Sequence, residues 1–268
     1  MAKSFIFVAL LILAGFMIQP MLADQFTKSK IEDIRKSAKQ GDPVAQYELG
    51  VIYDGGFEIP RDYEEAARWY RKSAENGNAQ AQYNLGVMYM KGHGIPQDDD
   101  KAASWYRKSA KQGNAAAQYN LGYMYSKGRG VTQNNEEAVK WFRRAAKQGN
   151  AYAQHNLGGM YAGGRGVEQD HEKAVEWYLK SAENGDATAQ YKLGGMYLAG
   201  RGVTQNAEEA VKWFRRAAEN GNVNSQYMLG LMYKKGSGVK QDREKTFKWY
   251  RKAAENGDAK AQYKLGGM

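Results

Sequence analysis

The chain has 268 residues, of which 43% are hydrophobic and 25% are charged, a globular composition that gives no reason to expect disorder. It contains no cysteine, which excludes disulfides, thiolate metal sites and cysteine nucleophiles. The formal net charge of +10 favours acidic partners or an anionic surface and says nothing about the fold.

The first 23 residues are predicted to be a signal peptide. Lys3 supplies a short positive region, and an apolar run extends from Phe5 to Ile18. The run is shorter than the roughly 20 apolar residues that a membrane-spanning helix needs, so an uncleaved anchor is the less favoured alternative. Cleavage after Ala23 would leave no stable membrane span.

The hexapeptide AQYNLG occurs at residues 81–86 and again at 117–122. Closely related hexapeptides recur at every step of 36 residues from Ala45 to Ala261. All six tryptophans keep the same step: Trp69, Trp105, Trp141, Trp177, Trp213 and Trp249. A fixed period of this length is typical of stacked supersecondary units.

Each unit is predicted to contain two helices. Ala81, Leu85 and Tyr89 share one helical face, and Ala102, Trp105 and Tyr106 keep the same rhythm further on. Asp or Asn precedes every predicted helix of the repeats as an N-cap, and a glycine follows every second helix. The pattern therefore predicts an all-α solenoid of antiparallel helix pairs with a 36-residue period.

The expected organisation follows from this period. We expect the signal peptide at 1–23, an N-terminal capping helix at 24–41, six repeats over 42–257 and a partial seventh repeat at 258–268. The six repeats are predicted at 42–77, 78–113, 114–149, 150–185, 186–221 and 222–257. The last predicted helix has no partner in the sequence, so we expect either further chain beyond Met268 or another molecule covering it.

The repeated small and aromatic residues are interpreted as core. A glycine such as Gly86 costs about 1 kcal/mol relative to alanine inside a helix. Repeating that cost in each unit predicts a close backbone contact, which we expect the bulky tryptophan to fill. The six tryptophans are then not a ligand cage.

The stretch from Ala116 to Gly149 resembles the Sel1-like repeat family, relatives of the tetratricopeptide repeat, throughout its length. The resemblance implies a right-handed superhelix that binds partners. Many bacterial members are exported, so it implies an exported, periplasmic or secreted protein. One exported branch carries disulfides and is linked to β-lactam binding or hydrolysis, but the absence of cysteine makes that branch a poor match.

Little in the sequence points to catalysis. His93, His155 and His171 lie in different units without metal-ligand spacing. Ser237 and Lys240 form a Ser-x-x-Lys string inside a glycine-rich loop, where chance is the better explanation. The Gly-x-Gly loops lack the strand and third glycine of a dinucleotide site. We therefore expect no enzyme activity, metal, cofactor or nucleic-acid partner, and keep a β-lactam- or peptidoglycan-related hydrolase or ligand-binding protein as the alternative.

A partner is expected on the concave face, which first helices line in tetratricopeptide-like stacks. Aromatic side chains with polar tips suit the recognition of a protein or peptide. The predicted partner-binding residues on this face are Tyr83, Tyr119, Tyr123, Tyr152, His155 and Tyr191. Packing between neighbouring units is the alternative role for the regularly repeated tyrosines.

A second surface is basic. Pairs of Lys or Arg follow the aromatic pair of most second helices, as in Arg71-Lys72 and Arg143-Arg144. We interpret them as a solvated outer face whose cations offset the helix dipole. The alternative is a docking stripe for an acidic protein or an anionic polysaccharide.

Overall fold

A computed structural model describes residues 28–56 and 59–268. The predicted signal peptide and the start of the predicted capping segment lie outside the described residues. Within those ranges the chain forms fourteen helices and no strand, which confirms the all-α prediction. The chain divides into two compact units, residues 1–114 and 115–268, and each is described here by itself.

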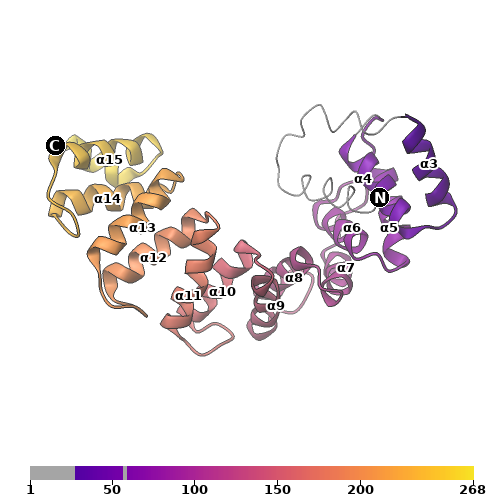
Figure 1. The fold of residues 1–268 in the computed structure, drawn as a ribbon, viewed down its shortest axis with the longest axis horizontal. Helices are drawn as coiled ribbons and strands as arrows, with labels where there is room; N and C mark the ends of the chain where they lie inside the picture. The colour runs from indigo at the N-terminus through magenta and orange to yellow at the C-terminus, as the bar shows by residue number, and fades with distance from the viewer. Residues whose placement is uncertain (1–27, 57–58) are drawn as a thin grey trace. The chain divides into compact units, whose positions relative to one another are not determined.

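The first unit contains five described helices (Figure 1). They are α3 (Lys28–Lys39), α4 (Pro43–Gly55), α5 (Tyr63–Glu75), α6 (Ala79–Lys91) and α7 (Asp99–Lys111). Each helix packs against the next one along the chain. Ile31, Ile34 and Ala38 of α3 are buried against α4 and Trp69 of α5, so α3 covers the end of this stack.

The second unit contains four helix pairs and one further helix. The pairs are α8 (Ala115–Lys127) with α9 (Asn135–Lys147), α10 (Ala151–Gly163) with α11 (His171–Glu183), α12 (Ala187–Ala199) with α13 (Ala207–Glu219), and α14 (Val223–Lys235) with α15 (Arg243–Glu255). The last helix, α16 (Ala259–Gly266), packs against α15. Stacked hairpins of this kind confirm the predicted solenoid.

The predicted caps define where the helices begin and end. In α6, for example, the side chain of Asn78 accepts hydrogen bonds from the backbone N–H groups of Gln80 and Ala81, both at 3.0 Å. At the end of α5, Gly77 has a φ of +90°, and the N–H of Asn78 donates to the carbonyl of Ser73. This bond closes a Schellman motif and reverses the chain between repeats.

A glycine in each first helix contacts the aromatic residue that follows the tryptophan. A Cβ on Gly86 would lie 2.8 Å from the ring of Tyr106, and a Cβ on Gly122 would lie 2.8 Å from Phe142. The prediction that tryptophan fills this space is therefore wrong. Consecutive helical residues point about 100° apart, so only the residue after the tryptophan faces the glycine.

The tryptophans lie at the edge of the core. Trp69, Trp141 and Trp213 are buried, and the other three are only partly buried. A Lys or Arg three residues later lies over every indole ring, at 3.9 Å for Lys108 over Trp105 and 5.5 Å for Lys252 over Trp249. The cation shields a ring face that the core does not cover.

The glutamine of the repeated hexapeptide joins neighbouring hairpins. Gln46 is 4% exposed, and its Nε2 donates to the carbonyl of Ala38 in the preceding second helix at 3.2 Å. Its Oε1 accepts from Nδ2 of Asn76 at the end of α5, also at 3.2 Å. Five other repeats keep the carbonyl or the amide bond of this bridge. A buried amide satisfied at both ends fixes the register between repeats.

Among the described helices, none combines the length and apolarity required to cross a membrane.

Neighbouring glycines in α12 provide a test of the close contact. A Cβ on Gly194 would lie 2.6 Å from the buried ring of Phe214, whereas a Cβ on Gly195 would meet nothing within 4 Å. We expect Gly194→Ala to lower the free energy of unfolding by about 1–3 kcal/mol through overpacking. Gly195→Ala should raise it by up to about 1 kcal/mol through helix propensity.

Urea denaturation of both variants, followed by circular dichroism, measures the difference. Equal effects of the two substitutions would contradict the close-contact interpretation.

Candidate partner-binding face

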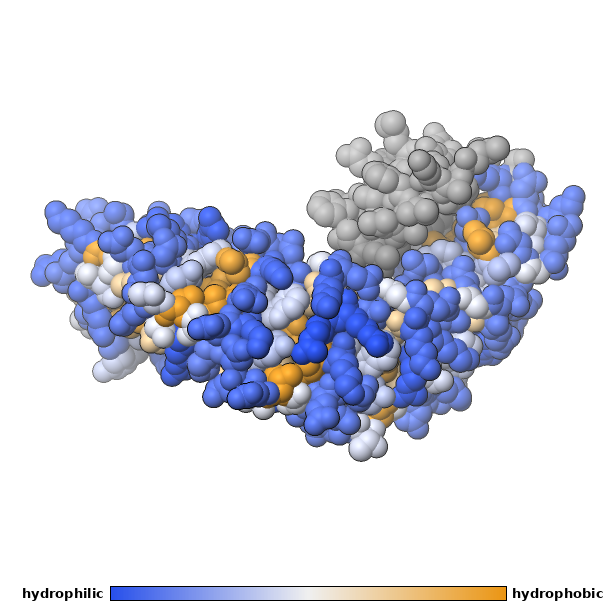
Figure 2. Space-filling view, turned by 60° about the horizontal axis from the view of Figure 1, so that its bottom comes forward, coloured by the Kyte–Doolittle hydropathy of each residue, from blue (hydrophilic) through white to orange (hydrophobic). Residues whose placement is uncertain are grey.

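Exposed tyrosines gather on the first helices of the second unit. Tyr152 on α10 is 69% exposed, and Tyr123 on α8 is 39% exposed. The ring of Tyr152 lies 5.8 Å from that of Tyr119, which is half-buried on α8. We call the exposed side of α8, α10, α12 and α14 the first-helix face. Large exposed hydrophobic side chains are few among the described residues, and much of the visible surface is hydrophilic (Figure 2).

Tyr119 connects this cluster to the next residues of α10. Burial raises the pKa of the Tyr119 hydroxyl, the nearby Tyr123 and Tyr152 act in the same direction, and a hydrogen bond with Asn156 opposes them. Asn156 also donates from Nδ2 to the Tyr152 carbonyl at 2.8 Å. Asn156 therefore adds a polar amide next to the tyrosine cluster.

The other predicted site tyrosines have a packing contact as well. Tyr83 in the first unit lies 5.8 Å from Tyr106, and Tyr191 in the second lies 5.8 Å from Phe214. Both are half-buried against the aromatic residue of their own repeat. The structure thus brings Tyr119, Tyr123 and Tyr152 together, while Tyr83 belongs to the first unit and Tyr191 lies further along the second.

His155 occupies the ladder position that is tyrosine in the other full repeats. Its ring lies edge-on to Tyr178 at 5.6 Å, and its Nδ1 lies 3.0 Å from Oδ2 of Asp186, the N-cap of α12. Burial alone would raise the pKa of Asp186, but the hydrogen bond and charge of His155, with bonds from Ser181 and Ala189, lower it to about 2. This pair links α10 to the next repeat.

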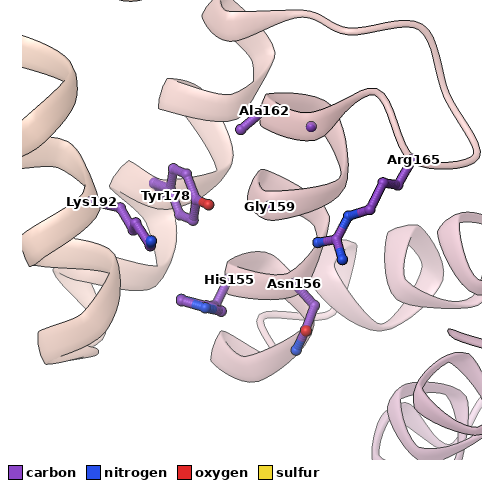
Figure 3. Close-up of a pocket in the computed structure, with 8 residues that line it drawn as sticks. His155, Asn156, Gly159, Ala162, Arg165, Tyr178 and Lys192 are labelled. Atoms are coloured by element: carbon purple, nitrogen blue, oxygen red, sulfur yellow. The ribbon is translucent and has the colours of Figure 1, made fainter. Parts of the chain in front are cut away.

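A hollow of about 390 Å³ opens beside His155 (Figure 3). Figure 3 shows Arg165 reaching from its loop past Gly159 toward Asn156, with Tyr178 and Lys192 on the opposite side. Arg165 follows the first glycine of a Gly-x-Gly loop, and its N–H donates to the carbonyl of Met160 at 3.0 Å. The loop thus places a cation at the rim of the hollow.

A second hollow of about 340 Å³ adjoins the first on the same face and shares Ala162, Tyr178 and Lys192 with it. Gly195 and Arg201 line it at the positions that Gly159 and Arg165 occupy one repeat earlier. Sequence reasoning did not select Arg165 or Arg201, because it considered the Gly-x-Gly loops for dinucleotide binding and found neither the strand nor the third glycine. The paired glycines in LGGM at 157–160 and 193–196 were the available signal.

The residues considered for catalysis remain apart. His93 stacks on Tyr63 with 4.9 Å between ring centroids, and His171 is the first residue of α11. Ser237 lies in the loop after α14, where its N–H donates to the carbonyl of Met232. Over the described ranges no group of three His, Asp or Glu residues has the geometry to hold a metal ion.

The basic side chains of the second helices contribute to packing. The second member of each pair lies over a tryptophan ring, as described above. In three repeats the first member of the pair is an arginine that donates to a tyrosine hydroxyl of the next helix along the chain. Examples are Arg143 to Tyr161 at 2.9 Å and Arg215 to Tyr233 at 2.8 Å. Much of the basic surface therefore stabilises the junctions between repeats.

Similarity to known protein families identifies the family of this chain. A model of the Sel1 repeat matches residues 43–78, 79–114, 115–150, 151–186, 187–222 and 223–258. The chain therefore belongs to the Sel1 repeat family, whose fold mediates protein–protein interaction. A search of curated proteins found no match.

Solved structures agree with this assignment. A protective antigen of uropathogenic Escherichia coli strains, c5321, is 42% identical over 88% of this chain, with a TM-score of 0.85, and the chain spans only 50% of that protein. A Sel1 repeat protein from Oxalobacter formigenes is 39% identical over 80% of this chain and 86% of its own, with a TM-score of 0.70. PilF of Pseudomonas aeruginosa, 18% identical over 87% of this chain and 100% of its own, with a TM-score of 0.59, shares the fold alone.

The His155–Asp186 pair gives a pH-dependent prediction. The hydrogen bond and charge of His155 are the largest causes that lower the pKa of Asp186. His155→Tyr, which restores the tyrosine of the other repeats, should raise the pKa of Asp186 from about 2 toward the ordinary value of about 3.9. Carboxyl ¹³C chemical shifts between pH 1.5 and 6 measure this pKa, and an unchanged titration would contradict the role given to His155.

The same pair affects stability. A carboxyl whose pKa is lower folded than unfolded stabilises the fold above its unfolded pKa and loses that contribution as the pH falls through the folded pKa. For Asp186 this window runs from about pH 4 down to about pH 2. Asp186→Asn keeps a capping side chain like that of Asn150, so it provides the matched control and should remove this part of the pH dependence.

Proposed function

We propose that the chain is an exported, non-catalytic adaptor that binds a protein or peptide on its first-helix face. The observation that carries the proposal is the cluster of Tyr119, Tyr123 and Tyr152. Tyr123 and Tyr152 are exposed although the core of their repeats is complete without them. Tyrosine combines a large contact area with a polar tip and is enriched at the energetic centres of interfaces.

The repeats themselves indicate that these side chains are not needed for packing. The position of Tyr152 is Ala116 in the preceding repeat, and the position of Tyr123 is Val87 in the repeat before it. The same fold is thus built with smaller residues at both places. A side chain that the scaffold can omit is the expected kind of residue for binding.

The rival function is hydrolysis or binding of β-lactam- or peptidoglycan-related compounds. It would need a nucleophile beside a base. The candidate nucleophile is Ser237 of the Ser-x-x-Lys string. It lies in a loop rather than at the start of a helix. This placement favours the adaptor.

Export is supported by the sequence of residues 1–23 alone. If the signal is cleaved after Ala23, the mature protein should begin at Asp24. N-terminal sequencing of the protein expressed from its full sequence in a bacterial host, after separation of periplasm, medium and cytoplasm, tests this directly. An intact Met1 on protein recovered from the cytoplasm would contradict export.

The adaptor role predicts that the tyrosine cluster can be cross-linked to a partner. Benzoylphenylalanine at position 152 should give a discrete photo-adduct in the native host, and the same group at the exposed position 212 of α13 should not. Mass spectrometry identifies the adduct, and binding is then measured with both proteins purified. The double variant Tyr152→Ala/Tyr123→Val should weaken it by about tenfold or more without altering the fold.

Each substitution introduces the residue of an equivalent position, so the circular dichroism spectrum and urea midpoint should stay close to those of the natural chain. Undiminished affinity of the double variant for the purified partner would exclude this cluster as the binding site.

A further inference from the structure

Two glycines of the first-helix face are not required by the packing. A Cβ on Gly195 would meet no atom within 4 Å. One on Gly159 would meet only the Tyr178 hydroxyl at 3.4 Å and a guanidinium nitrogen of Arg165 at 3.6 Å, which are ordinary contacts. Among residues other than proline, glycine is the least favourable inside a helix. These positions therefore need an explanation other than the core.

The absent side chains leave the two adjoining hollows. Repeats one and two have Val51 and Val87 at the equivalent positions, and the hollows of about 390 and 340 Å³ lie at repeats four and five. Because the hollows share lining residues, a single extended ligand can occupy both. Pockets of this size suit a side chain or a small group.

The lining of both hollows is basic. Arg165 and Lys192 line the first, Arg201 and Lys192 line the second, and no carboxylate lines either one within the described part of the chain. The backbone N–H groups of both arginines donate to a helix carbonyl at 3.0 Å. The two arginine side chains therefore leave the backbone at equivalent places in successive repeats.

A hydroxyl adds a neutral donor to the first hollow. In repeat one the hydroxyl of Tyr70 lies 3.2 Å from Oδ2 of Asp54. The equivalent pair in repeat four is Tyr178 and Ala162, so Tyr178 has lost that carboxylate acceptor, and both residues line the hollow. An arginine, a lysine and a tyrosine hydroxyl around one space form a donor set for a carboxylate.

We propose that the two hollows bind two carboxylate side chains of an acidic peptide lying across α10 and α12. This inference rests on the proposed adaptor function and specifies the chemistry of its partner. A peptide is favoured over a polysaccharide because Asn156 links the first hollow to the tyrosine cluster, which offers apolar contact to a peptide's other side chains. The overall charge of +10 favours the approach of an acidic segment.

The test starts with selection of a phage-displayed library of random twelve-residue peptides on the purified chain. The bound pool should be enriched in peptides with two Asp or Glu residues. Affinities of a selected peptide, synthesised with its acids and with Gln or Asn in their place, are then measured by fluorescence anisotropy. The amidated peptide should bind about tenfold or more weakly, and the affinity of the acidic one should fall with salt.

Variants of the protein locate the site. The double variant Arg165→Gln/Arg201→Gln should bind the acidic peptide about tenfold or more weakly, because each substitution removes a charged donor. Gly159→Val/Gly195→Val should do the same by filling the hollows with the residue of repeats one and two. Arg243→Gln is the matched control, since it removes a positive charge at the start of α15, and should change affinity less than about twofold.

The outcomes separate this inference from the adaptor function. Peptides that bind through Tyr152 but show no acidic enrichment, and that tolerate both double variants, would overturn the carboxylate site and leave the adaptor. Failure to select any peptide would overturn both the carboxylate site and the adaptor function for short peptide ligands. Heparin bound through Arg165 and Arg201, and not displaced by the acidic peptide, would show a sulfated polysaccharide site instead and overturn the inference.

Discussion

The contact between a helix glycine and an aromatic ring sets the geometry of every repeat. In all six hairpins a Cβ on that glycine would lie 2.5–2.8 Å from ring carbons, closer than atoms approach in folded proteins. The contact fixes how near the two helices of a hairpin lie. The buried glutamine then has its carbonyl and amide partners at nearly constant distances in successive repeats, so stacking depends on the same close approach.

Each hairpin is determined by its Asp or Asn caps, the glycine that contacts an aromatic ring, and the buried glutamine. Other positions of the first helices are therefore free to vary. Residue 152 and its equivalents are Val44, Gln80, Ala116, Tyr152, Thr188, Asn224 and Lys260, all within the same helical frame. A variable side chain on a fixed frame is already positioned for contact, which lowers the entropy lost on binding. The differences between repeats therefore carry the information about the partner.

The sequence predicted the fold well because its signals are periodic and local. An Asp or Asn cap, a terminating glycine and a period of 36 residues each have one physical interpretation. Periodicity could not decide which of two adjacent aromatics, Trp105 or Tyr106, faces Gly86, since this depends on helix rotation of about 100° per residue. The tyrosine cluster could be predicted from helix phase. The hollows could not, because Gly159, Arg165 and Lys192 meet only when loop and neighbouring helix are placed in space.

The positive charge has different roles on the two sides of the second unit. On the second helices, Arg144 and Arg216 lie over tryptophan rings, and Arg143 and Arg215 donate to tyrosine hydroxyls of the following helix. Those cations already have partners, so an approaching anion would compete with contacts that hold the repeats together. Arg165 and Arg201 instead extend from loops and line hollows that Gly159 and Gly195 leave open. A carboxylate bound by Arg165 and Arg201 would leave those second-helix contacts in place. For this reason the first-helix face, rather than the second-helix face, is where charge can select a partner.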